Sequence, residues 1–315
     1  MRATASGSLM RKYLLRAIAL KVASAFLFAV MSALVRFLGE NYPVGQIVFF
    51  RSAAAVLPVL LIYAWRHELD SAVRTTRPLG HLARGLISVF GMFCNFAALA
   101  RIPIVDATAI GFAAPLFTVA LAALILKERV RIFRWSAVIV GFFGILVMLV
   151  PNLDPALHTH GAPDVVGVLL AIVGAFCNAA SVIQTRRLTA TEATASIVFY
   201  FSLSCALAGL ATWPFGWVMP DGAALAALVA VGLCGVVAHI LLTESYRLAS
   251  AALLAPFDYT AMVWAFLLGY FFFGELPTRF IFVGGAIVTA AGLFVIWRER
   301  RLGLMRARAA ERAHG

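Results

Sequence analysis

The chain has 315 residues, of which 63% are hydrophobic and 13% are charged. Soluble domains are roughly 45–50% apolar and about 25% charged, so the composition excludes an ordinary soluble protein. The net charge of +12 does not indicate a nucleic-acid partner, because the basic residues lie between apolar runs and not along one face of a domain.

Apolar runs recur along nearly the whole chain, each of about 18–25 residues, the length that crosses a hydrocarbon layer of ~30 Å. Helices are expected, because the open edge of a sheet cannot remain unpaired in lipid. We predict an all-α integral membrane protein. The first run is long enough to be a retained span and not a cleaved signal. Ten transmembrane helices are predicted near residues 17–37, 44–65, 80–100, 104–126, 134–150, 165–185, 195–217, 223–246, 250–273 and 279–297.

The connections between the predicted spans are alternately rich and poor in basic residues, so these residues gather on one side of the arrangement. One side holds little beyond Arg101 and Arg279. By the positive-inside rule, the other side is cytoplasmic, and both termini lie there in a cytoplasmic (inner) membrane. An even number of helices agrees with this orientation. The basic residues assigned to the cytoplasmic side include Arg66, Arg74, Arg77, Arg84, Lys127, Arg129, Arg131, Arg134, Arg186, Arg187, Arg247 and the arginines of the tail.

Two parts of the chain resemble each other. The segment IVFFRS, residues 47–52, recurs 150 residues later as IVFYFS, with Phe201 in the place of Arg51. Further along the chain, Glu128 matches Glu275 at an offset of 147 residues. Phe26, Ala29, Arg36 and Leu38 also match Phe176, Ala179, Arg186 and Leu188 at the first offset.

The repeat predicts three parts: a first five-helix unit at 1–150, a second at 151–300 and a basic cytoplasmic tail at 301–315. Five is an odd number, so the second unit enters the membrane from the other side. Such an inverted-topology repeat is typical of secondary transporters, whose substrate site lies between the halves.

Three motifs resemble the EamA family of the drug/metabolite transporter superfamily. They are FFR at 49–51, DATAIGFAAPLFTVALAALILKER at 106–129 and APFDYTAMVWAFLLGYFFFGE at 255–275. The resemblance implies a ten-helix basket around a central cavity. It also implies that the first, third, fourth, sixth, eighth and ninth helices line the cavity, while the fifth and tenth are peripheral.

Polar groups within the spans are costly and are therefore the candidates for substrate binding. Asn95 and Asn178 can donate and accept hydrogen bonds, although they can equally join helices. Asp258 is expected to bind a cationic group or carry a coupling proton, or else to be a structural partner of His239, Asn95 or Arg51. His239 titrates near neutral pH if unperturbed and could form a proton-linked pair with Asp258.

Aromatic side chains on the implied cavity helices are the remaining substrate-binding candidates. Phe112, Tyr259 and Trp264 could stack a flat ring, although packing is the competing interpretation.

Three charged residues are predicted to be structural or gating groups: Arg51, Glu128 and Glu275. Arg51 is expected ~10 Å below the outer surface, seven residues into its helix, with Glu40, Asp106 or Glu275 as partner. The two glutamates occupy helix ends related by the repeat, where contact with an arginine would form a gate or hinge.

We predict secondary transport of a small organic metabolite by alternating access, with a flat heterocycle such as riboflavin as the first substrate class. Alternatives are export of amino acids or nucleosides and transport of S-adenosylmethionine. The chain lacks a phosphate-binding GxxxxGK[ST] motif, and the HxH at 158–160 is weak evidence for a metal, so neither cofactor nor metal is expected. An enzyme, a sensor and a scaffold are disfavoured, because neither a catalytic cluster nor a soluble domain is evident. Formation of a homodimer is left open.

Overall fold

The computed structural model describes residues 2–65, 74–125, 132–153, 164–189, 191–192, 194–249, 254–276 and 278–314. Within these residues the regular structure is entirely helical. The helices are α1 (Arg2–Gly39), α2 (Val44–Trp65), α4 (Pro78–Leu99), α5 (Ile104–Gly111), α6 (Ala114–Ile125), α7 (Ile132–Leu153), α8 (Val165–Leu188), α9 (Thr194–Ala211), η2 (Trp213–Phe215), α10 (Gly222–Leu248), η3 (Ala255–Tyr259), α12 (Thr260–Phe273) and α13 (Arg279–His314).

The predicted all-α membrane fold is confirmed, and each of the ten predicted spans corresponds to a helix or a broken helix. Among the described residues, five helical stretches are long and apolar enough to cross a membrane: Tyr13–Gly39, Pro78–Leu99, Ile104–Ile125, Val165–Leu188 and Gly222–Leu248. Shorter apolar helices occupy Val44–Val56, Trp135–Met148, Ser196–Ala211, Phe257–Phe273 and Arg279–Phe294.

The predicted fourth and ninth spans are interrupted. The fourth divides into α5 and α6 at Phe112, and the ninth begins as the 3-10 helix η3 before it continues as α12. Each break lies beside a proline, Pro115 or Pro256, which lacks the backbone N–H that a regular helix requires. The breaks fall at positions related by the 147-residue offset. Interrupted helices at corresponding places in two halves are a feature of transporter binding sites.

The first and last helices are longer than predicted. α1 begins at Arg2 and α13 continues to His314, well beyond the predicted limits of 17 and 297. The added segments contain several Arg, Ala and Leu residues, which favour helix, and they contain no proline. Helical propensity therefore extends both elements beyond the apolar runs from which they were predicted.

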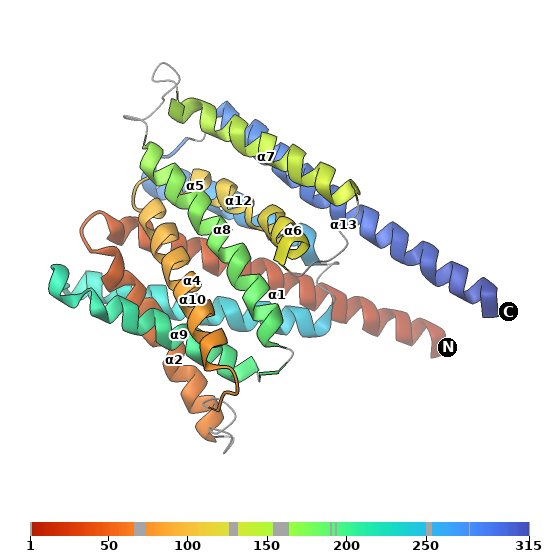
Figure 1. The fold of residues 1–315 in the computed structure, drawn as a ribbon, viewed down its shortest axis with the longest axis horizontal. Coiled ribbons are helices and arrows are strands. Elements are labelled where there is room, and N and C mark those ends of the chain that lie inside the picture. Colours follow the sequence, from red (N-terminus) through yellow and green to blue (C-terminus); the bar gives the residue numbers. More distant parts are fainter. Residues whose placement is uncertain are drawn as a thin grey trace.

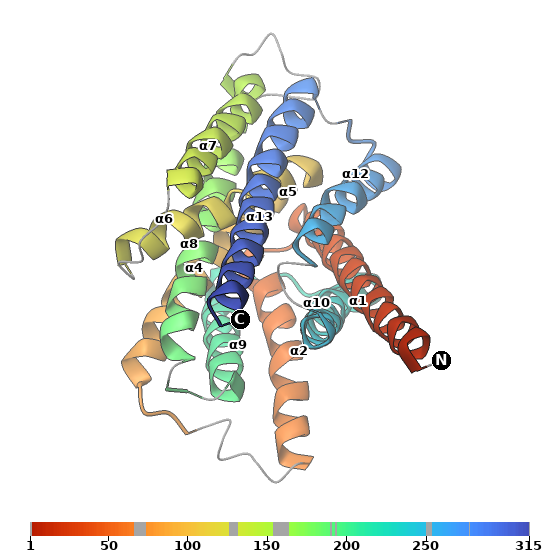
Figure 2. The same ribbon diagram turned by 90° about the vertical axis from the view of Figure 1, so that its right-hand side faces the viewer.

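The helices pack in pairs around a central space. In Figure 1, α7 and α13 lie side by side along one edge, and Figure 2 shows the same edge from the right. Gly144 on α7 and Gly284 on α13 permit this contact, because a Cβ atom added at either would collide with the carbonyl oxygen of the other. The fifth and tenth predicted spans are thus peripheral, as the family resemblance implies.

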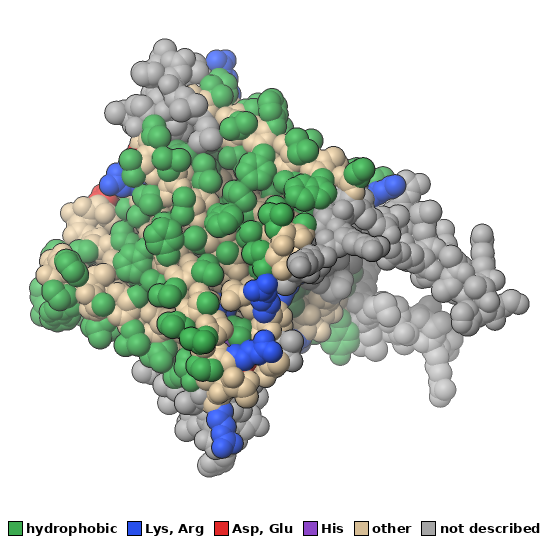
Figure 3. All heavy atoms as spheres, viewed as in Figure 1, with side chains coloured by type: hydrophobic (Ala, Val, Ile, Leu, Met, Phe, Trp, Pro, Cys, Tyr) green, Lys and Arg blue, Asp and Glu red, His purple; other side chains and the backbone are tan. Residues whose placement is uncertain are grey.

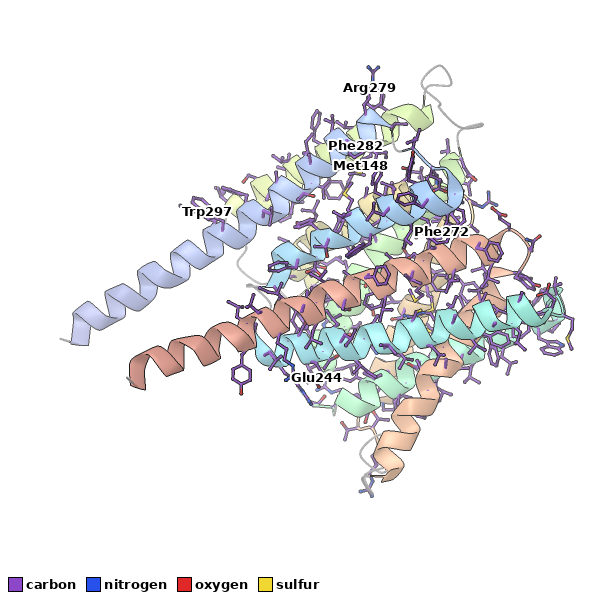
Figure 4. All side chains as sticks on the ribbon, turned by 180° about the vertical axis from the view of Figure 1, so that it is seen from behind. Met148, Glu244, Phe272, Arg279, Phe282 and Trp297 are labelled. Carbon is purple, nitrogen blue, oxygen red and sulfur yellow. The ribbon has the colours of Figure 1, made fainter. Side chains whose placement is uncertain are left out.

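Both chain termini lie on the same side of the bundle (Figure 1), which we name the terminal end, the other being the opposite end. In Figure 4, Glu244 and Trp297 lie nearer the termini, whereas Phe272 and Arg279 lie toward the opposite end. α1 therefore runs from the terminal end to the opposite end.

The surface is largely apolar. Hydrophobic side chains cover most of the face in Figure 3, with Lys and Arg toward its lower right and its edges. Large side chains such as Phe272, Phe282 and Leu79 are more than half exposed. A continuous apolar surface of this extent fits a hydrocarbon environment and not water. The protein is a multi-pass membrane protein.

Candidate functional site

A cavity of about 470 Å³ lies between the helices of the two halves of the chain. Its walls come from α1, α2, α4 and α5 of the first half and from α8, α9 and α10 of the second. This volume accommodates a small organic molecule, since ligand pockets commonly measure about 300–1,000 Å³.

Three of the predicted substrate-binding residues line this cavity: Asn95, Asn178 and His239. The amide nitrogen of Asn95 donates to the carbonyl of Gly91 at 2.8 Å. Asn178 lies in the cavity wall on α8, where its carboxamide can both donate and accept hydrogen bonds. The ring of His239 meets Phe28 edge to face, with 4.9 Å between centroids.

A glycine on the facing helix determines how Asn95 is held. A Cβ atom added at Gly174 on α8 would lie 2.7 Å from the carboxamide carbon, oxygen and nitrogen of Asn95. Real Cβ contacts are essentially never this short, so any other residue at this position would require the carboxamide of Asn95 to move. Gly174 therefore positions Asn95 in the cavity wall.

Arg51 also lines the cavity, although the resemblance does not place its helix among those that do so. Its nearest hydrogen-bonding contact is weak, from Nη1 to the sulfur of Met92 at 3.7 Å. Its buried Nε has no hydrogen-bond partner in the described part of the chain. The expected pairing with Glu40, Asp106 or Glu275 does not occur among the described residues, and Glu275 instead pairs with another arginine.

Arg84 is a second arginine in the cavity wall. Its Nε donates to the hydroxyl of Thr185 at 2.7 Å, and its Nη1 donates to the carbonyl of Ile197 at 2.7 Å. Its guanidinium lies over the ring of Phe201 at 5.0 Å. Sequence reasoning counted Arg84 as an interfacial charge because basic residues precede it, but it lies seven residues into α4.

Hydroxyl groups connect the wall near Arg84. Ser88 on α4 and Ser181 on α8 are 2.7 Å apart, so one hydroxyl donates to the other. Both residues line the cavity together with Thr185. Within the described residues, the lining contains two arginines and no Asp or Glu.

The remaining predicted substrate-binding residues lie outside the cavity lining: Phe112, Asp258, Tyr259 and Trp264. The rings of Phe112 and Tyr259 pack against each other with 5.0 Å between centroids. Trp264 meets Phe26 at 5.1 Å in an edge-to-face contact. The three aromatic candidates therefore pack on neighbouring side chains in this structure. Phe112 and Tyr259 do so at the two helix breaks, and Trp264 does so against α1.

Asp258 pairs with Lys21, a residue that sequence reasoning did not select. The ammonium nitrogen of Lys21 lies 2.5 Å from Oδ1 of Asp258 and donates to the hydroxyl of Tyr246 at 3.0 Å. The Lys21 side chain is 3% exposed, whereas that of Asp258 is 48% exposed. The expected partners of Asp258, namely His239, Asn95 and Arg51, do not contact it in this structure. The sequence does contain one indication of this role, because Lys21 is a lone lysine within the long apolar run of the first span.

A second ion pair joins α1 to the end of α12. The Nε of Arg36 lies 2.7 Å from Oε1 of Glu275, and Arg36 also donates to the carbonyl of Leu99 at 3.1 Å. The other carboxylate oxygen of Glu275 accepts from the backbone N–H of Ile104 at 2.9 Å. One buried glutamate therefore connects α1, α5 and α12 at the opposite end.

The C-terminus of α12 directs Glu275 back into the bundle. Gly274 adopts a left-handed conformation with a φ of 63°, which glycine tolerates without steric cost. The backbone N–H of Glu275 then bonds the carbonyl of Gly269 at 3.0 Å, as at many helix ends. Glu128, the position related to Glu275 by the repeat, lies outside the described residues.

A third polar cluster joins the start of α4 to the connection after α8. The backbone N–H and the hydroxyl of Thr76 donate to Oε1 of Glu192 at 2.9 and 2.6 Å. The Nε2 of His81 lies 3.3 Å from the other oxygen of Glu192. The hydrogen bond from the Thr76 hydroxyl, with smaller contributions from neighbouring groups, lowers the pKa of Glu192 to about 2. The ionised carboxylate therefore anchors this connection.

Within the described residues, no group of three or more His, Cys, Asp or Glu side chains could hold a metal ion. The four cysteines, Cys94, Cys177, Cys205 and Cys234, are free thiols. The HxH segment at 158–160 lies outside the described residues.

Comparison with known proteins identifies several relatives. The chain is 31% identical to the S-adenosylmethionine uptake transporter of Rickettsia prowazekii (strain Madrid E), over 84% of this chain and 87% of the relative. It is 33% identical to the riboflavin transporter of Rhizobium johnstonii, over 73% of this chain and 74% of the relative. It is 32% identical to the pseudopaline exporter CntI of Pseudomonas aeruginosa, over 86% and 93% of the two chains.

The fold also has a solved counterpart. One crystal structure superposes with a TM-score of 0.62 at 20% identity, covering 91% of this chain and 98% of the other. The sequence profile of the EamA-like transporter family matches two segments, residues 15–150 and 165–298. These segments contain all the cavity-lining residues. The chain belongs to the EamA-like transporter family, whose members carry small molecules across membranes.

Proposed function

We propose that the chain moves a small organic metabolite across the cytoplasmic membrane by alternating access, with both termini in the cytoplasm. The observation that carries this proposal is the cavity of about 470 Å³ between helices of the two halves. The halves act as inverted repeats, here taken as 1–150 and 151–300, and solute binds between them. The role of the chain is transport and not catalysis.

The ion pair between Arg36 and Glu275 is the candidate for the gate at the opposite end. Because it joins α1 and α12 beside the start of α5, separation of these elements must break it. Positive-inside orientation makes this the outer gate. In this proposal the pair stabilises the outward-closed shape and dissociates when the cavity opens to the outside.

The names of the relatives suggest two solutes for the first assays. S-adenosylmethionine is supported by a relative that aligns over 84% of this chain, and riboflavin by one that aligns over 73%. Both molecules carry a flat heterocycle and many heteroatoms, which suits a wall containing Asn95, Asn178, Ser88 and Ser181.

The proposal is tested by uptake into proteoliposomes that contain the purified protein. Labelled S-adenosylmethionine, riboflavin, amino acids and nucleosides are supplied with and without a proton gradient. We expect uptake of at least one solute above that of protein-free liposomes, with saturation and competition by the unlabelled solute. Absence of saturable uptake of every solute under both conditions would contradict the proposal.

A further inference from the structure

Two guanidinium groups face one cavity whose lining contains no carboxylate among the described residues. Arg51 comes from α2 and Arg84 from α4, and neither forms an ion pair within the described part of the chain. The other polar lining groups are hydroxyls, the amides of Asn95 and Asn178, and the imidazole of His239. The cavity therefore has a positive charge that no lining side chain neutralises.

Such a charge is costly at membrane depth. A buried ion loses its hydration, and unless a counter-charge and hydrogen bonds replace it, the charged form is strongly disfavoured. Charged residues within spans for this reason usually pair with an acid or face a ligand path. Arg51 lacks the acid, since its strongest polar contact is the thioether of Met92.

The two arginines differ in how much of their hydrogen-bonding capacity is already used. Arg84 is held by Thr185, the carbonyl of Ile197 and the face of Phe201. By contrast, Arg51 keeps a buried Nε without a partner. A planar guanidinium offers donors in a fork that matches the two oxygens of a carboxylate or phosphate.

We propose that Arg51 and Arg84 form an anion subsite, which binds a carboxylate or phosphate group of the transported solute. This inference rests on the proposed function, because the subsite belongs to the same cavity. The anion supplies the missing counter-charge, with Arg51 as the main ligand and Arg84 as a pre-positioned second charge. A solute with such a group is therefore preferred over its neutral analogue.

The duplicated sequence accounts for the arrangement. Phe201 occupies the position in the second half that Arg51 occupies in the first, and both residues line the cavity. Phe201 supports the guanidinium of Arg84 with its ring. One copy of the motif thus provides an anion ligand, and the other provides the aromatic support for the second arginine.

The test measures binding to the purified full-length protein by equilibrium dialysis, using two pairs of probes. One pair is S-adenosylmethionine and its decarboxylated analogue, which differ in a carboxylate. The other pair is flavin mononucleotide and riboflavin, which differ in a phosphate. In the parent protein we expect at least one probe that carries the carboxylate or phosphate to bind roughly tenfold to hundredfold more tightly than its counterpart without that group. The pair that shows this preference identifies the anionic group.

Variants then assign the preference to residues. Arg51→Gln is expected to reduce the preference to about twofold or less, Arg84→Gln to reduce it in part, and Arg51→Lys to retain an intermediate preference. The matched control is Arg101→Gln, because Arg101 is an exposed arginine outside the cavity that pairs with Asp164. Size-exclusion elution and thermal unfolding check that each variant is folded. If Arg51→Gln does not fold, Arg84→Gln replaces it as the test of the preference.

The outcomes separate this inference from the proposed function. Equal binding within both pairs, no binding of any probe, or a preference unchanged in both glutamine variants would each overturn the anion subsite. If uptake assays show transport while the pairs bind equally, the function stands and the subsite falls. A clear preference that depends on Arg51, without transport of any solute, supports the subsite and counts against the function.

Discussion

Arg36 and Glu275 lie 239 positions apart in sequence, yet the Nε of one is 2.7 Å from the Oε1 of the other. The same glutamate accepts the backbone N–H of Ile104. Three helices therefore meet at a single buried carboxylate at the opposite end of the bundle.

Replacement of Glu275 by Gln is expected to open the cavity at this end more often. Hydrogen bonds to charged groups contribute about 1.5–3 kcal/mol, so the open population should rise roughly tenfold or more. A cysteine introduced at Asn178, which lines the cavity, serves as the reporter. A membrane-impermeant thiol reagent is added outside cells, and modification at position 178 is measured by mass spectrometry.

The control for this experiment is Glu244→Gln. Glu244 also pairs with an arginine, Arg247 at 2.9 Å, but both side chains are exposed, and Glu244 lies toward the terminal end (Figure 4). Exposed pairs contribute little, so the labelling rate should not change. Equal labelling in parent and Glu275→Gln would show that the Arg36–Glu275 pair does not limit access.

Lys21 and Asp258 should respond unequally to mutation. Asp258→Asn leaves a buried ammonium beside Tyr246 without its counter-charge, which costs about 1–3 kcal/mol of the free energy of unfolding. Lys21→Met leaves a carboxylate that is already half exposed, and the methionine fills the apolar surroundings. Thermal unfolding in detergent should therefore show a larger loss for Asp258→Asn, and the reverse order would contradict this assignment.

Gly174→Ala is expected to impair solute binding while the fold remains intact. The added methyl group would collide with the carboxamide of Asn95 and move it from the cavity wall. Loss of one hydrogen bond corresponds to about a 2- to 10-fold weaker apparent affinity for solute. Uptake kinetics measure the apparent affinity for solute, and thermal unfolding measures whether the fold remains intact.

Gly111→Ala is the matched control, because a Cβ atom added there meets no atom within 4 Å. Alanine is also the better helix former, so stability should be unchanged or slightly higher. A similar loss of affinity in both glycine variants, or none in Gly174→Ala, would remove Gly174 as the determinant of Asn95 position.

Glu192 should make the stability of the protein depend on pH in acid. Because hydrogen bonding lowers its pKa from 4.5 to about 2, its ionised form stabilises the folded state. This contribution is complete above about pH 4.5 and is lost as the pH falls through about 2. The midpoint temperature of thermal unfolding should be lower for Glu192→Gln than for the parent at pH 7. The difference between the two midpoints should shrink below pH 4.5. A difference that is constant from pH 7 to pH 3 would contradict this role.

Much of the fold follows from the apolar pattern. Runs long enough to cross a bilayer predict all ten spans, since backbone groups in lipid must be satisfied within helices. The apolar pattern does not show the break at Phe112, whereas Pro256 does indicate a bend before Thr260, because it removes a backbone donor within an apolar run. The apolar pattern also does not show how far α1 and α13 continue into their polar segments.

The site could be predicted only in part. Asn95, Asn178 and His239 stand out as polar residues in apolar runs, and the structure brings them to one cavity. Arg84 was missed because its position near a basic connection resembles an ordinary interfacial charge. Lys21 was missed because its partner lies 237 positions away, and pairings at that distance depend on the tertiary fold.

Counterflow in proteoliposomes tests the central claim most directly. Vesicles are loaded with unlabelled S-adenosylmethionine or riboflavin, diluted, and supplied with a trace of the labelled solute. An alternating-access carrier predicts a transient accumulation of label above its equilibrium level for at least one solute, because efflux of unlabelled solute returns the site outward. Accumulation that never exceeds that of protein-free vesicles for either solute, while the protein is folded and inserted, would contradict the account.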